Sequence, residues 1–276
     1  MIDRKRVILS SVEELFDKAS LDYKNLSVGY SDNINFRKYF DLIPEDYLSF
    51  AKKDLKQRDE RGLINALSNA KRAIDCLIEN TLKNFDINIK KLPKVALNFC
   101  EEVLNEEDKQ ISPFSLRLFC ALGLSPSILI SEVRSLRNKV EHEFSNPQKK
   151  DVLRACEVAE LLVNNLKAKE LYSCAIDISD TKKHEGLSEG SVTGVRFNYV
   201  YSFLNKNESF YIYFYDKNDT FYEYYFSPED KIYYYFLKAM FIAEFDTDEL
   251  ELCIKRIIRE ISPNLELDEI NISLRV

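Results

Sequence analysis

The chain has 276 residues, a formal net charge of -7 and 45% hydrophobic residues. This length and apolar content suit one large domain or two small ones with buried cores. The acidic charge argues against a large non-specific nucleic-acid surface, because such binding needs many contacts between phosphates and Lys or Arg. Residues 1–10 are charged and lack a long apolar run. We therefore expect no signal peptide and no membrane span, and a location in the cytosol.

Helical patterns dominate the first part of the chain. Ser11 followed by Glu14 fits a capping box at the start of a short helix, whereas residues 21–40 have no clear period and predict a loop or short strands. Apolar residues three and four apart predict a long amphipathic helix over residues 58–84. Further helices should begin near the prolines at positions 44, 93, 126 and 147, the last two covering residues 127–144 and 147–171. Pro113 and Pro126 bound a short apolar segment. These elements predict an all-helical domain over residues 1–176 with up-down connections.

Residues 177–191 are polar and contain glycine, which predicts a linker. The linker contains His184, for which a solvated loop position is the simplest interpretation. Beyond it the period changes to that of strands, with three aromatic runs at residues 195–203, 210–215 and 221–226. Helices are expected over residues 228–245 and 247–261, and an edge strand over 269–274. The predicted fold class is α+β, an all-helical domain followed by a small aromatic-rich α+β domain over residues 192–276.

The aromatic residues of this second domain allow two interpretations. Of the chain's 34 aromatic residues, 20 fall between Phe197 and Phe245. Exposed rings on a sheet could stack on RNA bases. Rings are also favoured in strands for packing alone, and these runs lack interleaved Lys and Arg. We therefore favour burial in the domain's own sheet or against a protein, and expect this domain to serve sensing, inhibition or assembly with little contribution to RNA affinity.

Residues 137–142 read Arg-Asn-Lys-Val-Glu-His and hold one of the two histidines of the chain. At about 100° per residue, one apolar sector of this helix should be buried, namely Leu129, Val133, Leu136, Val140 and Phe144. A neighbouring polar sector holds Arg134, Asn138, Glu141, His142 and Ser145. Arg137 lies on the border and needs an anionic partner. Glu141, four residues on, could be that partner, as could a second subunit or a substrate phosphate.

An arginine, a polar residue directly after it and a histidine after four intervening residues resemble the Arg-x4-6-His motif of HEPN-domain proteins. Residues 65–74 resemble the first long helix of such domains, and Asn146-Pro147 opens a following helix as theirs often does. The resemblance covers about half of the chain. It implies a helical bundle, a metal-independent ribonuclease site, and a homodimer in which the motifs of two subunits form one composite site.

By this resemblance, Arg137 and His142 would be catalytic, and Asn138 would help to orient the scissile phosphate. Histidine can exchange a proton with the 2'-oxygen or the leaving 5'-oxygen, and arginine can stabilise the charge of a phosphorane. Glu141 departs from a bare phosphate pocket, because its carboxylate could repel RNA or neutralise Arg137. A basic cluster surrounds the motif and could bind RNA, or could be ordinary solvated surface: Arg134, Lys139 and Arg154, together with Lys149 and Lys150.

Two functions are therefore expected as alternatives. The first is a metal-independent endoribonuclease of toxin or antiviral-defence type, with RNA as substrate and a regulatory or antitoxin protein as a further partner. The second is a non-catalytic HEPN-like module for dimerisation or protein interaction, in which the motif forms a buried polar network. No cofactor or metal is expected, because the six cysteines lack a zinc-site spacing and read as buried free thiols, at positions 76, 100, 120, 156, 174 and 253.

Overall fold

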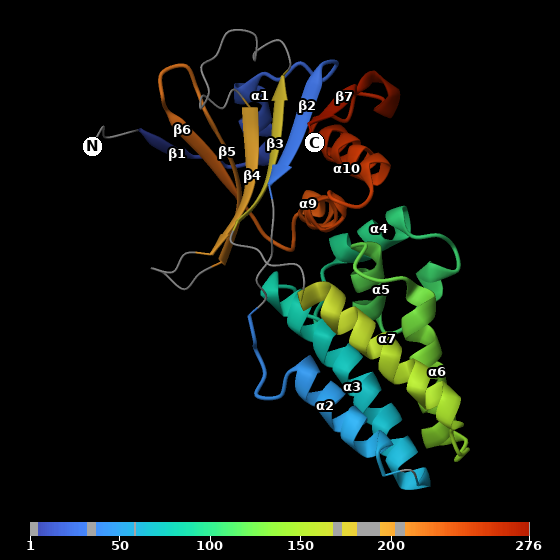
Figure 1. Cartoon of the computed structure of the whole chain (residues 1–276). Coiled ribbons are helices and arrows are strands. Elements are labelled where there is room, and N and C mark those ends of the chain that lie inside the picture. Colours follow the sequence, from blue (N-terminus) through green and yellow to red (C-terminus); the bar gives the residue numbers. More distant parts are fainter. Residues whose placement is uncertain are drawn as a thin grey trace. The chain divides into compact units, whose positions relative to one another are not determined.

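The computed structural model describes residues 5–31, 37–57, 59–167, 173–180, 194–201 and 208–275. The chain forms two compact units. Asn35–Glu170 is helical, whereas Met1–Ile34 and Leu171–Val276 together form a unit built on a β-sheet (Figure 1). The expected mixed α+β class is confirmed. The helical unit is inserted into the chain of the sheet unit, and this order differs from the expected succession of two domains.

The helical unit contains six α-helices in its described part: α2 (Pro44–Leu55), α3 (Glu60–Asn84), α4 (Lys94–Val103), α5 (Phe114–Ala121), α6 (Ser127–His142) and α7 (Lys149–Lys167). Proline occupies the first position of α2 and the position just before α4, α5 and α6. The fixed φ of proline suits the start of a helix, and its missing N–H costs nothing there. This is why Pro44, Pro93 and Pro126 predicted the starts of α2, α4 and α6 well.

Helix α3 lies at the centre of this unit and packs against α2, α5, α6 and α7. It starts at Asp59, whose side chain accepts a 2.6 Å hydrogen bond from the Gly62 backbone N–H. Its buried face has the predicted spacing of three and four residues and includes Ala66, Leu67, Ala70, Ala73, Ile74 and Leu77. The short alanine side chains let neighbouring helices come close. Helix α6 is thereby held between α3 and α7.

The sheet unit has seven described strands in the order β1-β6-β5-β4-β3-β2-β7. The strands are β1 (Arg6–Ile8), β2 (Leu26–Ser31), β3 (Ser173–Asp180), β4 (Gly194–Tyr201), β5 (Glu208–Tyr215), β6 (Phe221–Phe226) and β7 (Ile272–Arg275). The outer strands β1 and β7 pair in parallel with β6 and β2, and the inner pairs are antiparallel. The expected hairpins β4–β5–β6 and the expected edge strand β7 are confirmed.

Helices α1 (Val12–Ala19), α9 (Lys231–Ile242) and α10 (Thr247–Ile261) pack with this sheet (Figure 1). Phe197, Phe210 and Phe226 form an aromatic core with Phe236 of α9, and all four are buried. Burial of the rings in the domain's own sheet is therefore confirmed for these phenylalanines. Strand alternation places a second set of rings, among them Tyr211, Tyr213 and Tyr225, on the opposite face. Of these three, Tyr211 and Tyr213 are half-buried and Tyr225 is exposed.

The expected domain boundaries need correction. Residues 6–31 were expected in the helical domain but supply β1, α1 and β2 to the sheet unit. Strand β3 begins at Ser173 and continues into the expected linker, where Asp177 pairs with Gly29 of β2 and Arg196 of β4. These pairs join residues far apart in sequence, so local period does not reveal them. The rest of that linker, including His184, lies outside the described residues. In the described ranges, no helix is both long enough and apolar enough to cross a membrane.

Candidate functional site at the end of α6

The Arg-x4-His sequence occupies the last turns of α6. The first half of this helix is anchored by buried Ile130 and Val133, and by the Ser127 hydroxyl, which donates a hydrogen bond to Asp108. The helix ends at His142, and Lys139 and His142 both lie in its last turn. The positive charge of Lys139 near that end complements the helix dipole. The motif therefore sits on a firmly packed helix but near its solvent-facing end.

Arg137 forms an ion pair with Glu141, four residues later on α6. The exposed fractions of the two side chains are 27% and 33%, so the pair is half-buried. The sequence suggested Glu141, a second subunit or a substrate phosphate as the partner of Arg137. In the single chain, the partner is the carboxylate of Glu141.

Asn138 and His142 are exposed and lie four residues apart on α6. Residues with that spacing lie on one side of a helix. Arg137 and His142 are five residues apart, which separates them by about 140° around the axis. A single chain thus presents Asn138 and His142 together and Arg137 toward a different side. Arg137 and His142 could meet one phosphate only if a second copy supplies one of them or the arginine side chain swings round.

The expected apolar face of α6 is only partly correct. Val133 is buried, and Leu129, Leu136 and Val140 are half-buried. Phe144 was expected in this face, but it is 88% exposed. The helix has already ended at His142, and Phe144 adopts a left-handed backbone with φ of 53°. This turn points the ring away from the bundle, so the prediction that extended the helix to residue 144 placed Phe144 wrongly.

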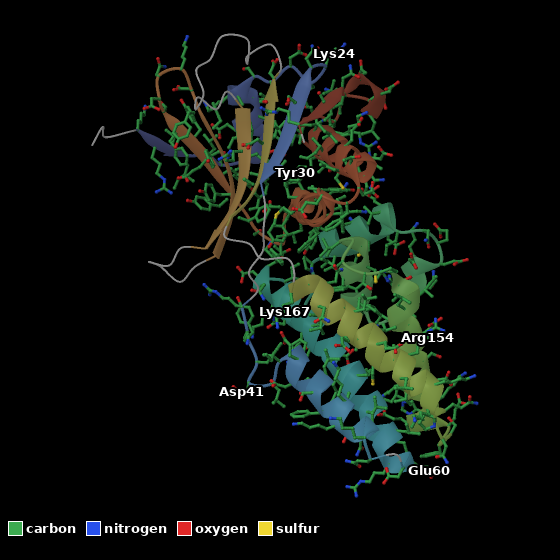
Figure 2. The ribbon with its side chains drawn as sticks, viewed as in Figure 1. Lys24, Tyr30, Asp41, Glu60, Arg154 and Lys167 are labelled. Atoms are coloured by element: carbon green, nitrogen blue, oxygen red, sulfur yellow. The ribbon has the colours of Figure 1, made fainter. Side chains whose placement is uncertain are left out.

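The arginines expected to bind RNA have carboxylate partners. Arg134 Nη1 lies 2.7 Å from Asp75 Oδ1 on α3, and Arg154 Nη2 lies 2.8 Å from Glu132 Oε2 on α6. Arg154 is on α7 (Figure 2). Lys139 is exposed, as are Lys149 and Lys150. The basic residues thus lie on α6 and α7, which pack against each other. Both arginines are paired with acids that the sequence analysis did not single out.

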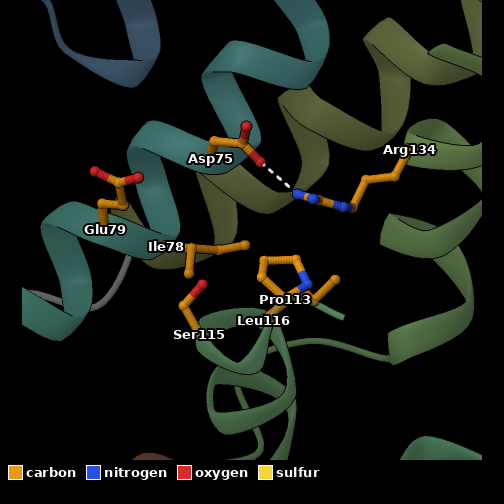
Figure 3. A pocket seen from close by; sticks show the side chains of 7 residues that line it. All are labelled: Asp75, Ile78, Glu79, Pro113, Ser115, Leu116 and Arg134. Atoms are coloured by element: carbon orange, nitrogen blue, oxygen red, sulfur yellow. Dashed lines mark hydrogen bonds and ion pairs between the residues drawn. The ribbon is translucent and has the colours of Figure 1, made fainter. Parts of the chain in front are cut away.

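Arg134 also lines a cavity of about 100 Å³ (Figure 3). Asp75, Ile78 and Glu79 of α3 form one side, and Pro113, Ser115 and Leu116 at the start of α5 form the other. Lys71 forms a second ion pair with Asp75. In the sequence, the four-residue spacing of Lys71 and Asp75 is compatible with this ion pair. The sequence does not indicate that the start of α5 lines the same cavity.

The described cysteines are free thiols, as expected, and four are buried: Cys100, Cys120, Cys156 and Cys253. Burial raises the pKa of each of these four thiols to about 11 or 12. Cys76 is half-buried, and the side chain of Cys174 lies outside the described residues. Within the described part of the chain, no group of three or more His, Cys, Asp or Glu side chains is placed to hold a metal ion.

Comparison with known proteins finds no matching family model, no matching curated protein and no matching solved structure.

Proposed function

We propose that the chain is a metal-independent endoribonuclease of HEPN type, of the toxin or antiviral-defence class, acting in the cytosol. Its site would be composite, with Arg137, Asn138 and His142 from each of two subunits around one scissile phosphate. Arg134, Lys139 and Arg154 would contact the RNA on either side. The helical unit would then be a HEPN-like bundle.

The observation that supports this proposal most is the exposure of Asn138 and His142 beside a half-exposed Arg137 at the end of α6. A histidine within reach of solvent can take a proton from a 2'-hydroxyl or give one to a leaving 5'-oxygen. A guanidinium presents forked N–H donors to the non-bridging oxygens of the phosphate. Attack of the 2'-oxygen on phosphorus breaks the bond to the 5'-oxygen and leaves a 2',3'-cyclic phosphate.

The ion pair between Arg137 and Glu141 does not prevent this chemistry. A surface pair with this spacing stabilises a helix by only about 0.3–0.5 kcal/mol. A doubly contacted phosphate binds a guanidinium more strongly than that, so a substrate can displace the Glu141 carboxylate. In a dimer, the freed Arg137 of one subunit can face the His142 of the other, which removes the difficulty of their 140° separation in one chain.

The same ion pair favours a second candidate function. If Arg137 stays bound to Glu141, the motif is a polar patch that fixes the contact between two copies, and the protein is a non-catalytic dimerisation or interaction module. In that case Arg137→Ala should weaken the dimer, and no RNA should be cut.

Substitutions of the motif separate the two functions. Arg137→Ala and His142→Ala should each reduce cleavage of single-stranded RNA by about 100-fold or more, the usual contribution of a general acid or base. Both residues lie at the surface end of α6, so melting temperatures should stay close to that of the parent. Cleavage unchanged in both variants would refute the assigned site.

A further inference from the structure

The face of the sheet opposite the aromatic core carries rings where a solvated sheet face usually carries polar side chains. Residues that point to this face alternate with the core residues along β5 and β6. Five of them form one continuous group of rings, which we call the tyrosine face: Tyr211, Tyr213, Tyr215, Phe221 and Tyr225. The ring centroids of contacting pairs in this group are between 5.0 and 5.9 Å apart.

The three described α-helices of the sheet unit all lie on the other face. Helix α9 packs on Phe197, Lys18 of α1 lies 5.6 Å from the ring centroid of Tyr222, and α10 packs on α9. Both rings point away from the tyrosine face, because Phe197 pairs with Ile212 and Tyr222 pairs with Phe214. No described helix of this unit therefore covers the tyrosine face.

Part of the tyrosine face is open to solvent. Tyr225 is 39% exposed, and the other four rings are half-buried. Ile8 of β1 is 66% exposed and pairs with Glu223 of β6, so it extends the same face. The described strand residues of this face include no lysine. Exposed tyrosine and other apolar side chains gathered in one patch, with arginine present and lysine absent, are typical of a protein interface.

The charges beside the rings are paired with each other. Arg196 of β4 donates through Nε and Nη2 to the two carboxylate oxygens of Asp177, at 2.5 Å and 2.7 Å. Arg6 of β1 makes the same double contact with Glu223, and its Nη2 also donates to the Tyr225 hydroxyl at 2.7 Å. RNA phosphates or an acidic segment would have to break these pairs to reach a guanidinium. An uncharged partner leaves them intact, so charge complementarity favours a neutral occupant.

One of the arginines also orients a tyrosine hydroxyl. The Tyr213 hydroxyl oxygen accepts a hydrogen bond from Arg196. Its own O–H is then directed away from the guanidinium and can donate to an acceptor on a partner. Tyr225 differs, because its O–H donates to Glu223 Oε2 at 3.0 Å. The tyrosine face thus presents a hydroxyl donor among uncharged rings, and a matching partner must supply an acceptor there.

We propose that the tyrosine face binds a neutral, proline-rich segment of a partner protein in the polyproline II conformation. This conformation leaves the backbone carbonyls free to accept from Tyr213, whereas a docked helix uses its carbonyls internally. Proline rings carry no charge and pack on aromatic rings, which is how aromatic-lined surfaces bind such segments. The row from Tyr211 to Tyr215 spans about 13 Å along β5, a length that matches about four residues of polyproline II.

Fluorescence polarisation of a labelled decaproline peptide with the full chain tests this surface. Decaproline should bind at least about tenfold more tightly than a Gly/Ser peptide of equal length, which has no rings and loses more conformational entropy on binding. Tyr211→Ala removes a ring that contacts Tyr213 and Tyr225, so it should weaken decaproline binding about tenfold or more. Tyr213→Phe keeps the ring and removes only the hydroxyl, so it should weaken binding about threefold to tenfold. Tyr47→Phe, at a half-buried tyrosine of α2, is the matched control and should leave binding unchanged.

Equal binding of decaproline and the Gly/Ser peptide would overturn the proposal, as would decaproline binding unchanged in Tyr213→Phe. If Tyr211→Ala lowers the melting temperature, Tyr213→Phe alone decides, because it keeps the ring packing. A labelled oligouridylate of ten nucleotides tests the other class of partner. Binding of this RNA that is lost in Tyr211→Ala would assign the face to base stacking and overturn the proposal. His142→Ala should bind decaproline like the parent, so the result does not depend on the ribonuclease proposal.

Discussion

At the residue scale, Glu141 is the side chain on which the two candidate functions differ most. Its carboxylate pairs with Arg137 in the isolated chain and must leave if Arg137 is to meet a phosphate. Glu141→Gln should therefore raise kcat/KM for RNA about twofold or more, as expected when an ion pair of about 0.5 kcal/mol no longer competes with the substrate. Steady-state cleavage of a fluorescent RNA measures this, with Glu157→Gln as control. A fall in activity to the level of Arg137→Ala would show that Glu141 has a positive role.

The buried cysteines give a second prediction at this scale. Burial raises the pKa of the Cys100 and Cys253 thiols from the ordinary 9.0 to about 12. The unfolded chain therefore releases these protons first, so the thiols favour the folded state fully below pH 9 and progressively less as the pH rises toward 12. Site-resolved mass spectrometry after treatment with iodoacetamide at pH 8 should find both unmodified in the native protein and modified in guanidinium. Rapid native labelling would contradict their burial.

At the element scale, two glycines respond differently to the same substitution. A Cβ at Gly62, in the first turn of α3, would lie 2.5 Å from the backbone oxygen of Asp54 in α2. Gly62→Ala should therefore destabilise the chain by about 1–3 kcal/mol, the usual cost of overpacking. A Cβ at Gly29 would meet only Arg275 atoms at ordinary contact distances, 3.9 Å and 4.0 Å. Gly29→Ala in β2 should be neutral or mildly stabilising. Thermal unfolding compares the two variants, and equal losses of stability would contradict this difference in Cβ contacts.

Elements with strong local features could be predicted from the sequence. Prolines mark the starts of α2, α4 and α6, and aromatic alternation marks β4 to β6. Strands β1 to β3 lack such features. Strand β1 has only three residues, and in β3 the adjacent residues Ala175 and Ile176 are both buried, so β3 shows no clean alternation. At the candidate site, local spacing indicated the pair Arg137–Glu141. Asp75, Glu79 and the start of α5 come together only through packing of distant helices, so the cavity could not be predicted.

At the scale of the whole molecule, the helical unit is inserted into the sheet unit, and this decides which fragments of the chain contain all the strands or helices of one unit. Residues 1–175 include β2, whose partners β3 and β7 would be incomplete or missing in such a fragment. Residues 35–170 form one compact helical unit. We expect the fragment of residues 35–170 to be monodisperse and helical by circular dichroism, and the fragment of residues 1–175 to aggregate through its unpaired β2 edge. Equal behaviour of both fragments in size-exclusion chromatography would contradict the assignment of β1 and β2 to the sheet unit.

The oligomeric state of the full chain can also be predicted. A composite site needs two α6 ends facing each other about a two-fold axis, so the full chain should be a dimer at micromolar concentration. The exposed ring of Phe144 lies two residues beyond His142 and would be covered by such a contact. Phe144→Ser should then shift sedimentation toward the monomer, whereas the exposed Phe245→Ser should leave it unchanged. A monomer in the parent would contradict the composite site.

The most direct test of the central claim is the product formed from single-stranded RNA in excess EDTA. If the RNA's own 2'-hydroxyl attacks within the proposed site of Arg137, Asn138 and His142, cleavage should persist in chelator and disappear in His142→Ala. The products should end in a 2',3'-cyclic phosphate. Abolition of cleavage by EDTA, or fragments ending in a free 3'-hydroxyl, would contradict the account.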